Sequence, residues 1–129
     1  MAFIPQKKKT YDAPDKDHRV ICRDAFDIED GMRLVFQIVS IQHPVQVYFA
    51  GKNYKRTDEK FMDDLITWLG LEGAQKVLRP DGSVEYEKLK GLYADIRIEH
   101  IHNDEYEKPY SFVKEIKAPG ELTNFSVAA

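Results

Sequence analysis

The chain has 129 residues, which is enough for one domain with a hydrophobic core of its own, and its 43% hydrophobic content is typical of a folded protein. A single cysteine, Cys22, excludes an intrachain disulfide framework, and no stretch approaches the roughly 20 apolar residues that span a bilayer. Because Met1–Thr10 also lacks the apolar core of a signal peptide, we expect a cytoplasmic protein. The formal net charge of −3 argues against general attraction to polyanions but is compatible with a local basic groove.

Charge and proline content set the first residues apart from the rest. Residues 1–17 contain two prolines and the run Lys7–Lys9 but few aliphatic side chains, so we expect a flexible or docking arm. Residues 121–129 show no strong pattern and are expected to form a loose C-terminal tail. A single folded domain is therefore expected over residues 18–120.

Three strand-like runs come first in this region. In His18–Ile28, apolar and charged side chains alternate, which is the signature of a half-buried strand, and Gly31 follows in the expected turn. Met32–Gln42 is apolar at almost every position and predicts a central strand. Pro44 interrupts the pattern, and Val45–Ala50 then alternates again.

One amphipathic helix follows the three strands. Over Asp58–Leu69, apolar side chains recur at spacings of three and four residues, and the acidic start suits the positive end of the helix dipole. Gly70 is a good terminator for this helix. A short second helix is expected at Glu72–Leu78 and a further helical turn at Glu85–Lys90.

Two more strand-like runs complete the domain. Leu92–His102 shows the most regular alternation in the sequence, and Tyr110–Lys117 follows a polar loop. Three strands, a helix and two strands follow one another in this order in an OB-fold, the small Greek-key barrel that binds oligonucleotides. The sequence therefore predicts a mainly β fold, a five-stranded OB-like barrel with the helix between strands three and four.

A basic stretch, Gly51–Arg56, is expected to form the connection into the helix. Its three cations suit phosphate groups and its tyrosine suits an unpaired base, so the combination is typical of a single-strand binding loop. A solvated charged loop without a ligand explains the same composition. The candidate binding residues from this stretch are Lys52, Tyr54, Lys55 and Arg56.

Further basic and aromatic side chains fall on the polar positions of the expected strands. Together they would form one sheet face on which tyrosines stack bases and arginines contact phosphates. The alternative is that Arg97 and Arg23 pair with the carboxylates of Glu99, Asp95 or Asp24, because sequence alone does not define the register between strands. The candidates on this face are Arg19, Arg23, Arg33, Tyr48, Tyr93 and Arg97.

One pair of histidines suggests a metal site, but a catalytic motif is missing. His100 and His102 point the same way in a strand, with Asp104 and Glu105 nearby, but two histidines without a third placed ligand are weak evidence, and a strand end that enters the loop explains them better. Paired carboxylates elsewhere sit in no catalytic frame, and the chain has neither a glycine-rich phosphate loop nor a nucleophile motif. We therefore expect no enzyme activity and no cofactor.

Four segments carry a resemblance to known proteins. Trp68–Gly70 ends the helix, Lys90–His100 is a strand led by glycine, and Tyr106–Tyr110 precedes a last strand that runs into Ile116–Gly120. In these features the chain resembles a family of small proteins of phages and integrated elements, formerly of unknown function and associated with single-stranded-DNA binding beside recombination genes. The resemblance covers roughly residues 18–120 and implies an OB-like fold. The last five residues depart from the acidic tail through which bacterial single-strand-binding proteins recruit partners.

Architecture, candidate residues and resemblance together predict a single-stranded-DNA-binding protein. It would act in phage or mobile-element replication or recombination, with proteins of those processes as further partners. Because one barrel gains affinity when several are linked, we expect a homo-oligomer, most simply a dimer through a strand edge or the Met1–Asp17 arm. A protein-interaction module without nucleic-acid binding, such as an accessory protein or inhibitor, is the alternative that the acidic net charge favours. An enzyme that uses His100 and His102 would need a bound metal.

Overall fold

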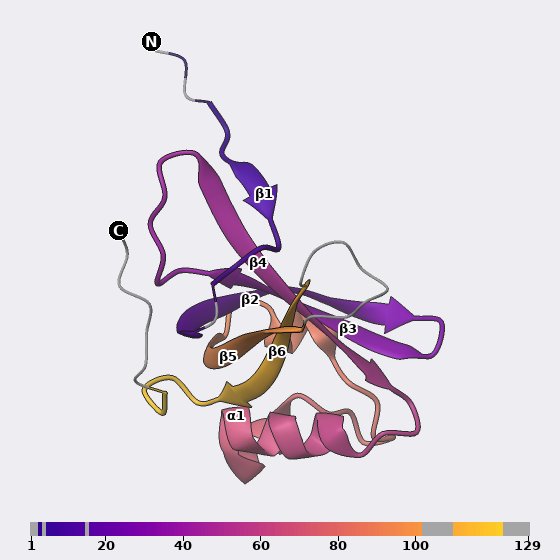
Figure 1. Ribbon diagram of the computed structural model, residues 1–129. Helices are drawn as coiled ribbons and strands as arrows, with labels where there is room; N and C mark the ends of the chain where they lie inside the picture. The colour runs from indigo at the N-terminus through magenta and orange to yellow at the C-terminus, as the bar shows by residue number, and fades with distance from the viewer. Residues whose placement is uncertain (1–2, 4, 15, 102–109, 123–129) are drawn as a thin grey trace.

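Figure 1 shows a computed structural model of the chain, which describes residues 3, 5–14, 16–101 and 110–122; for residues 100–101 and 110–112 it describes the backbone alone. This part of the chain is mainly β, with one six-stranded mixed sheet and two helices. The strands are β1 (Lys8–Thr10), β2 (Lys16–Ile28), β3 (Gly31–Ile38), β4 (Gln46–Lys55), β5 (Tyr93–Ile101) and β6 (Tyr110–Lys117), and the helices are α1 (Lys60–Lys76) and α2 (Tyr86–Leu89).

The strands lie in the order β1-β4-β3-β2-β5-β6. Strands β2, β3 and β4 form an antiparallel meander, β5 pairs antiparallel with β2, and β6 pairs antiparallel with β5, whereas β1 runs parallel to β4. The far end of the sheet returns toward β4, where Nζ of Lys52 donates a hydrogen bond of 2.9 Å to the carbonyl of Val113 on β6. A side chain makes this contact, and no backbone ladder among the described strands joins β4 to β6.

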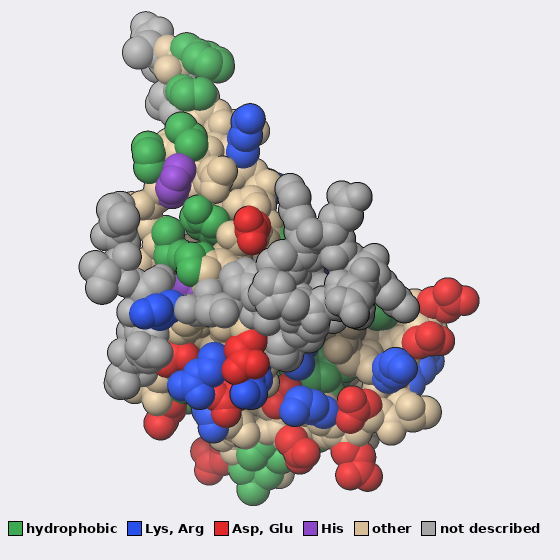
Figure 2. Space-filling view, viewed as in Figure 1, with side chains coloured by type: hydrophobic (Ala, Val, Ile, Leu, Met, Phe, Trp, Pro, Cys, Tyr) green, Lys and Arg blue, Asp and Glu red, His purple; other side chains and the backbone are tan. Residues whose placement is uncertain are grey.

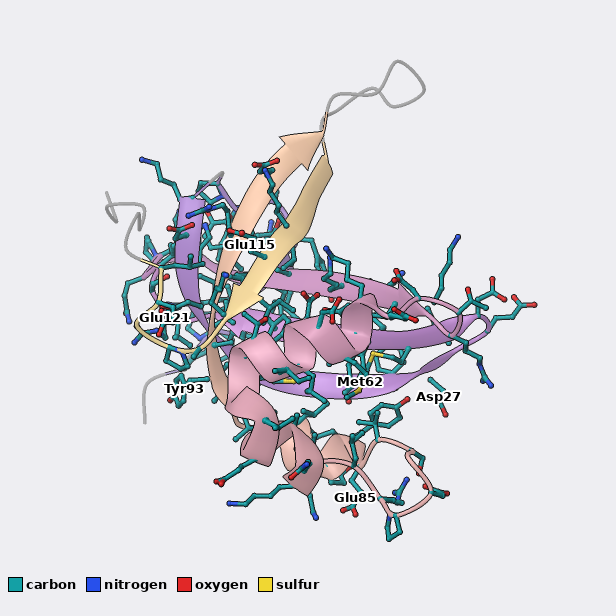
Figure 3. The ribbon with its side chains drawn as sticks, turned by 90° about the horizontal axis from the view of Figure 1, so that it is seen from below. Asp27, Met62, Glu85, Tyr93, Glu115 and Glu121 are labelled. Carbon is teal, nitrogen blue, oxygen red and sulfur yellow. The ribbon has the colours of Figure 1, made fainter. Side chains whose placement is uncertain are left out.

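Helix α1 covers one side of the sheet and completes the core. Trp68 from α1 packs against Phe36 on β3 with ring centroids 5.7 Å apart, and its indole N–H donates to the carbonyl of Tyr93 on β5 at 2.8 Å. Leu65, one turn earlier, is fully buried. Figure 3 shows α1 lying across the strands when the molecule is seen from below. Leu65 and Trp68 of the predicted apolar stripe therefore face the sheet, whereas Met62 and Ile66 are exposed.

The helix prediction is confirmed, with one refinement. α1 starts at Lys60 and continues past Gly70, where φ of 77° and ψ of 169° interrupt the helical backbone. A positive φ of this kind is easiest for glycine. The first predicted helix therefore does stop at Gly70, and the predicted second helix at Glu72–Leu78 corresponds to the second segment of the kinked α1.

Strand β4 is longer than the sequence predicted. The stretch Gly51–Arg56, expected as a connection, belongs to β4 as far as Lys55. Strand alternation explains this, because Tyr54 is buried while its neighbours on both sides are exposed. The run Met32–Gln42, by contrast, is a strand only as far as Ile38.

A sixth strand joins the sheet at the start of β4. β1 lies within the segment expected as an arm and pairs with residues 46–48, which precede the ladder between β4 and β3. Figure 2 shows hydrophobic side chains along the extension that β1 and the start of β4 form, whereas acidic and basic side chains mix over the lower part of the molecule. The arm thus contributes a structured element beside the meander.

Candidate nucleic-acid interface

The side of the sheet opposite α1, which we call the outer face, presents alternate side chains of the meander. On β3, Arg33 and Gln37 alternate with the buried Leu34 and Phe36 and therefore point away from the core. The register places Phe49 of β4 directly opposite Gln37. Side chains of neighbouring strands thus meet on one surface.

A groove of about 500 Å³ opens on this face where the arm lies beside the start of β4. Lys7 and Lys9 approach it from the arm and Arg23 from β2, while Val47 and Phe49 of β4 supply apolar surface. None of the described residues that line it is acidic. We call this the cationic groove; its lining is Gln6, Lys7, Lys9, Arg23, Gln37, Val47 and Phe49.

Arg23 orients the amide of Gln37 within the cationic groove. Its Nε donates a hydrogen bond of 2.7 Å to Oε1 of Gln37. Because a guanidinium can only donate, the amide presents its oxygen to Arg23 and keeps its NH₂ group as a donor for another acceptor. The groove therefore combines positive charge with an oriented donor, which suits phosphate and base carbonyl oxygens.

Phe49 supplies an aromatic surface beside the cations. Nζ of Lys9 lies 5.6 Å from the centroid of its ring, within the range of a cation–π contact. The ring is half-buried. An aromatic ring flanked by cations can stack an unpaired base while the cations hold the adjoining phosphates.

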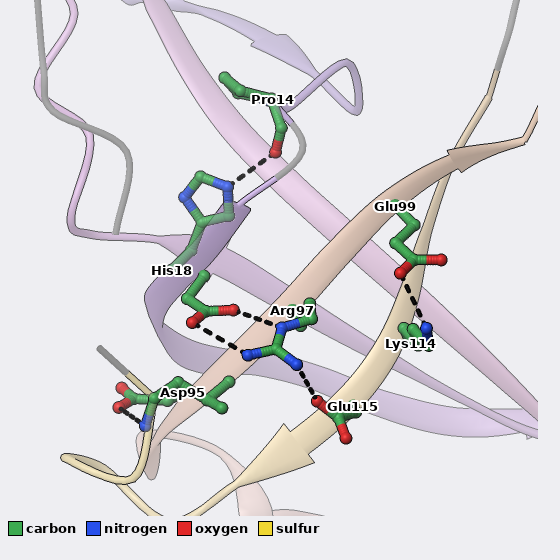
Figure 4. A network of polar contacts seen from close by, with 9 residues as sticks. Pro14, His18, Asp95, Arg97, Glu99, Lys114 and Glu115 are labelled. Carbon is green, nitrogen blue, oxygen red and sulfur yellow. Dashed lines mark hydrogen bonds and ion pairs between the residues drawn. The ribbon is translucent and has the colours of Figure 1, made fainter. Parts of the chain in front are cut away.

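The outer face beyond β2 is charge-balanced instead (Figure 4). Nε of Arg97 on β5 donates to Oδ1 of Asp17 at 2.8 Å. Arg19 on β2 forms an ion pair with Asp95. Both carboxylates are buried, and hydrogen bonds to them raise the pKa of Arg19 and Arg97. These contacts fasten β5 to β2. We call this set the ion-pair network; its members are Asp17, Arg19, Asp95, Arg97 and Glu115.

The structure therefore separates arginines that the sequence grouped together. Arg97 is paired with carboxylates, as the alternative had it, although its partners are Asp17 and Glu115. Arg19, which the alternative did not name, is paired with Asp95. Arg23 bonds to an amide and lines the cationic groove. Of these three arginines, only Arg23 keeps a charge that no carboxylate among the described residues neutralises, and it lies in the groove that Phe49 also lines.

Two candidates on β4 serve the core. Tyr54 is 3% exposed, packs edge-on against Phe61 with centroids 5.1 Å apart, and donates to Oδ2 of Asp64 at 2.7 Å. Burial raises the pKa of Tyr54 and lowers that of Lys52, whose Nζ bonds to the carbonyl of Val113. The sequence assigned Tyr54 to base stacking, and its burial removes the open ring face that stacking needs.

The two other cations of that stretch lie away from the cationic groove. Lys55 and Arg56 are exposed and line a separate pocket of about 420 Å³ near the start of α1. Asp27 and Asp58 line the same pocket, and the hydroxyl of Tyr86 donates a hydrogen bond to Asp27. Charges of both signs meet there, so this pocket has no net preference for phosphate.

The remaining tyrosine candidates are spread over the sheet. Tyr48 is half-buried and packs edge-on against His43, with ring centroids 6.1 Å apart. Tyr93 is 52% exposed, but it lies on β5, on the far side of β2 from the groove. Neither lines the cationic groove.

The metal candidates fall mostly where the structure gives no description. His102, Asp104 and Glu105 lie outside the described residues, and His100 is described by its backbone alone. Within the described part of the chain, no three or more His, Cys, Asp or Glu side chains are grouped so as to hold a metal ion. A search of the same residues finds no helix with the length and apolar character to cross a membrane.

Sequence reasoning missed most of the groove. Lys7 and Lys9 stood out as a lysine cluster but were assigned to an arm, because a three-residue parallel strand has no periodic signature. Val47 and Phe49 were visible as alternating apolar residues on one face of a strand. The two signals point to one site only when the pairing of β1 with β4 is known.

Comparison of the chain with protein-family models, with curated proteins and with solved structures finds no match. The resemblance to phage and integrated-element proteins therefore stays a prediction. The groove and the strand order are the features of the molecule that bear on function.

Proposed function

We propose that the protein binds single-stranded DNA in the cationic groove. The observation that carries this proposal is the convergence of Lys7, Lys9 and Arg23 around Phe49, without a carboxylate among the described lining residues. Cations neutralise phosphates, and an aromatic ring stacks on a base that is free of its partner. A duplex buries the faces of its bases in the stack, so an aromatic floor suits a single strand.

The strand order supports an OB-like barrel for this function. Strands β2 to β6 follow the order of the five OB strands, α1 lies between the third and fourth, and β6 returns to β4 at the Lys52–Val113 contact. OB-folds bind oligonucleotides on the face of their second and third strands. The equivalent strands here are β3 and β4, which carry Gln37 and Phe49.

The biological role that we propose needs no chemistry. The protein would cover single strands exposed during replication or recombination of a phage or mobile element and release them to the enzymes of those processes. The net charge of −3 does not oppose this, because phosphates respond to charges within about 8–10 Å. A homo-oligomer would place several grooves on one strand and raise its overall affinity.

The test is fluorescence anisotropy with a labelled oligothymidine over a range of salt concentrations. We expect affinity to fall by about 0.7 log units per contacted phosphate for each log unit of salt. The double variant Lys9→Ala/Arg23→Ala should lower that slope by about 1.4 and weaken binding about tenfold or more.

A control removes the same charge elsewhere. Lys60 and Lys76 are exposed at the two ends of α1, outside the cationic groove. Lys60→Ala/Lys76→Ala should leave the affinity within about twofold, because phosphates in the groove do not contact these side chains. Absence of binding at low salt, or equal losses in both double variants, would contradict the proposal, and tighter binding of an oligouridine would reassign the ligand to RNA.

A protein-interaction module is the second candidate function. Helix α1 exposes apolar side chains, with Met62 38%, Ile66 39% and Leu71 63% exposed, and Met62 is labelled in Figure 3. Exposed apolar side chains of this kind favour a protein partner. This function predicts no oligonucleotide binding in the anisotropy assay, so the same measurement separates the two candidates.

A further inference from the structure

One aromatic ring of the arm, Tyr11, lies beside the cationic groove and is half exposed, at 50%. Anchors on both sides hold it in place. Before it, the amide of Lys8 donates to the carbonyl of Val45 at 2.9 Å, and after it Ala13 is 1% exposed and the carbonyl of Pro14 lies 2.9 Å from Nε2 of His18. A tyrosine on a free tail would leave its ring unplaced, whereas this ring is held against the outer face.

The ring of Tyr11 rests against Phe49 and a guanidinium. Its centroid is 6.1 Å from that of Phe49, with the two planes inclined at 39°, and Cζ of Arg33 lies 5.8 Å from it. Nη1 of Arg33 in turn donates to Oδ1 of Asn53 at 2.8 Å. The guanidinium is thus held both by the amide oxygen and by the aromatic ring.

Gly51 makes room for this arrangement. A Cβ atom at position 51 would overlap the guanidinium of Arg33, which lies across the backbone of β4 at this point. Because the overlapping atoms are the far end of a flexible side chain, a larger residue would push Arg33 aside rather than disrupt the sheet. The glycine therefore lets Arg33 reach the ring of Tyr11.

We propose that Tyr11 is a second base-stacking platform, next to Phe49, that takes an adjacent base of the same strand. The inference rests on the proposed function of the cationic groove. A half-exposed ring with a cation packed against it offers a π surface for a base, while Lys9, two residues earlier, contacts Phe49 and supplies charge for the phosphate between the two bases. Arg33 and Gly51 are positioning residues, because they act through the ring of Tyr11.

The test compares two probes, an oligothymidine and an abasic oligonucleotide of the same length. The abasic probe keeps every phosphate and loses every base, so it reports charge contacts alone. Tyr11→Leu, which keeps an apolar contact with Phe49, should weaken oligothymidine binding about fivefold or more and change binding of the abasic probe less than twofold. Tyr11→Phe keeps the ring and should bind both probes like the parent chain.

Gly51→Ala gives an independent test. By displacing Arg33, it should lower the ratio of oligothymidine to abasic affinity without lowering abasic affinity, and a merely structural role of Gly51 would reduce both affinities together. Equal losses on both probes, or no loss in Tyr11→Leu, would overturn the inference. If Lys9→Ala/Arg23→Ala weakens both probes while Tyr11→Leu weakens neither, only the platform is wrong; if the double variant weakens neither, the proposed function itself fails.

Discussion

The two parts of the outer face use the same residue types in opposite ways. In the ion-pair network, Arg97 and Arg19 are neutralised by the buried carboxylates of Asp17 and Asp95. In the cationic groove, Lys9 and Arg23 contact an aromatic ring and an amide. The first arrangement holds strands together, and the second leaves positive charge available to a ligand.

The difference shows that the partner of a cation, and not its position on a polar strand face, decides its role. Transferring a charge into a buried setting is costly unless it is paired, so the network carboxylates need their arginines. The cationic groove has no such requirement, and its cations can exchange water for phosphate. Substitutions in the network should therefore change stability, and substitutions in the groove should change binding.

The largest expected effect is on stability and comes from Asp95. Its buried carboxylate accepts hydrogen bonds from Arg19 and from the backbone N–H of Gly120, the latter at 2.7 Å. Asp95→Ala removes these acceptors and should lower the free energy of unfolding by about 3 kcal/mol, measured by urea denaturation. Oligothymidine affinity should stay within about twofold at a temperature where the variant is folded.

An exposed carboxylate provides the control for this prediction. Glu121 is exposed on the turn after β6, and Glu121→Ala should change stability by no more than about 0.5 kcal/mol. If Asp95→Ala weakens DNA binding without loss of stability, the network belongs to the binding site and the division of the outer face is wrong.

A smaller effect is expected at Lys52, which the sequence assigned to phosphate contacts. Its Nζ bonds to the carbonyl of Val113 and lies 5.5 Å from the ring centroid of Tyr54. Lys52→Met keeps the apolar stem and removes the hydrogen bond, so it should cost about 1–2 kcal/mol in the free energy of unfolding. The affinity for oligothymidine should not change. If Lys52→Met instead lowered the slope of log affinity against log salt by about 0.7, the value of one phosphate contact, Lys52 would belong to the binding site.

The smallest effect concerns pH and the anchor of the arm. His18 is fully buried, its Nε2 donates to the carbonyl of Pro14, and its Nδ1 has no hydrogen-bond partner among the described residues. Burial lowers the pKa of His18, although Asp17 and the carbonyl of Pro14 act in the opposite direction. The unfolded chain therefore takes up a proton below about pH 6.5 before the folded chain does.

Stability should consequently fall as the pH drops below about 6.5 toward the lower folded-state pKa, with a slope of at most about 1.4 kcal/mol per pH unit from this residue. Thermal and urea unfolding at pH values from about 7.5 to about 5, on both sides of the ordinary histidine pKa of about 6.5, would measure this pH dependence. His18→Gln should flatten the dependence. An identical slope in parent and variant would show that other groups cause it.

Periodic elements of the fold were accessible from sequence. The bounds of β6 match the expected run Tyr110–Lys117, and the interruption of α1 at Gly70 follows from the conformational freedom of glycine. β1 was not accessible, because its three residues pair in parallel with β4 and carry no alternation long enough to detect. The sequence did not predict that β4 extends to Lys55, because residues 52–55 are mostly polar and have the composition of a loop. Tyr54, which is buried in the core, is the exception.

The candidate site was less accessible than the fold. Whether an arginine is neutralised depends on residues far away in sequence, as when Arg97 meets Asp17 through the register of β5 on β2. The groove likewise depends on the arm meeting Phe49 across β4. Arg23 was chosen from sequence because its residue type and strand position suit a phosphate contact. In the structure it lines the cationic groove, and its partner is the amide of Gln37 on β3.

Nuclear magnetic resonance of the ¹⁵N-labelled chain, titrated with oligothymidine, tests the division of the outer face most directly. We expect the largest amide shift changes at Lys9, Arg23, Gln37 and Phe49, which line the cationic groove. Amides of the ion-pair network around Arg97 should move little. Largest changes around Arg97 on β5 and β6, or around Lys55 at the start of α1, would contradict the account.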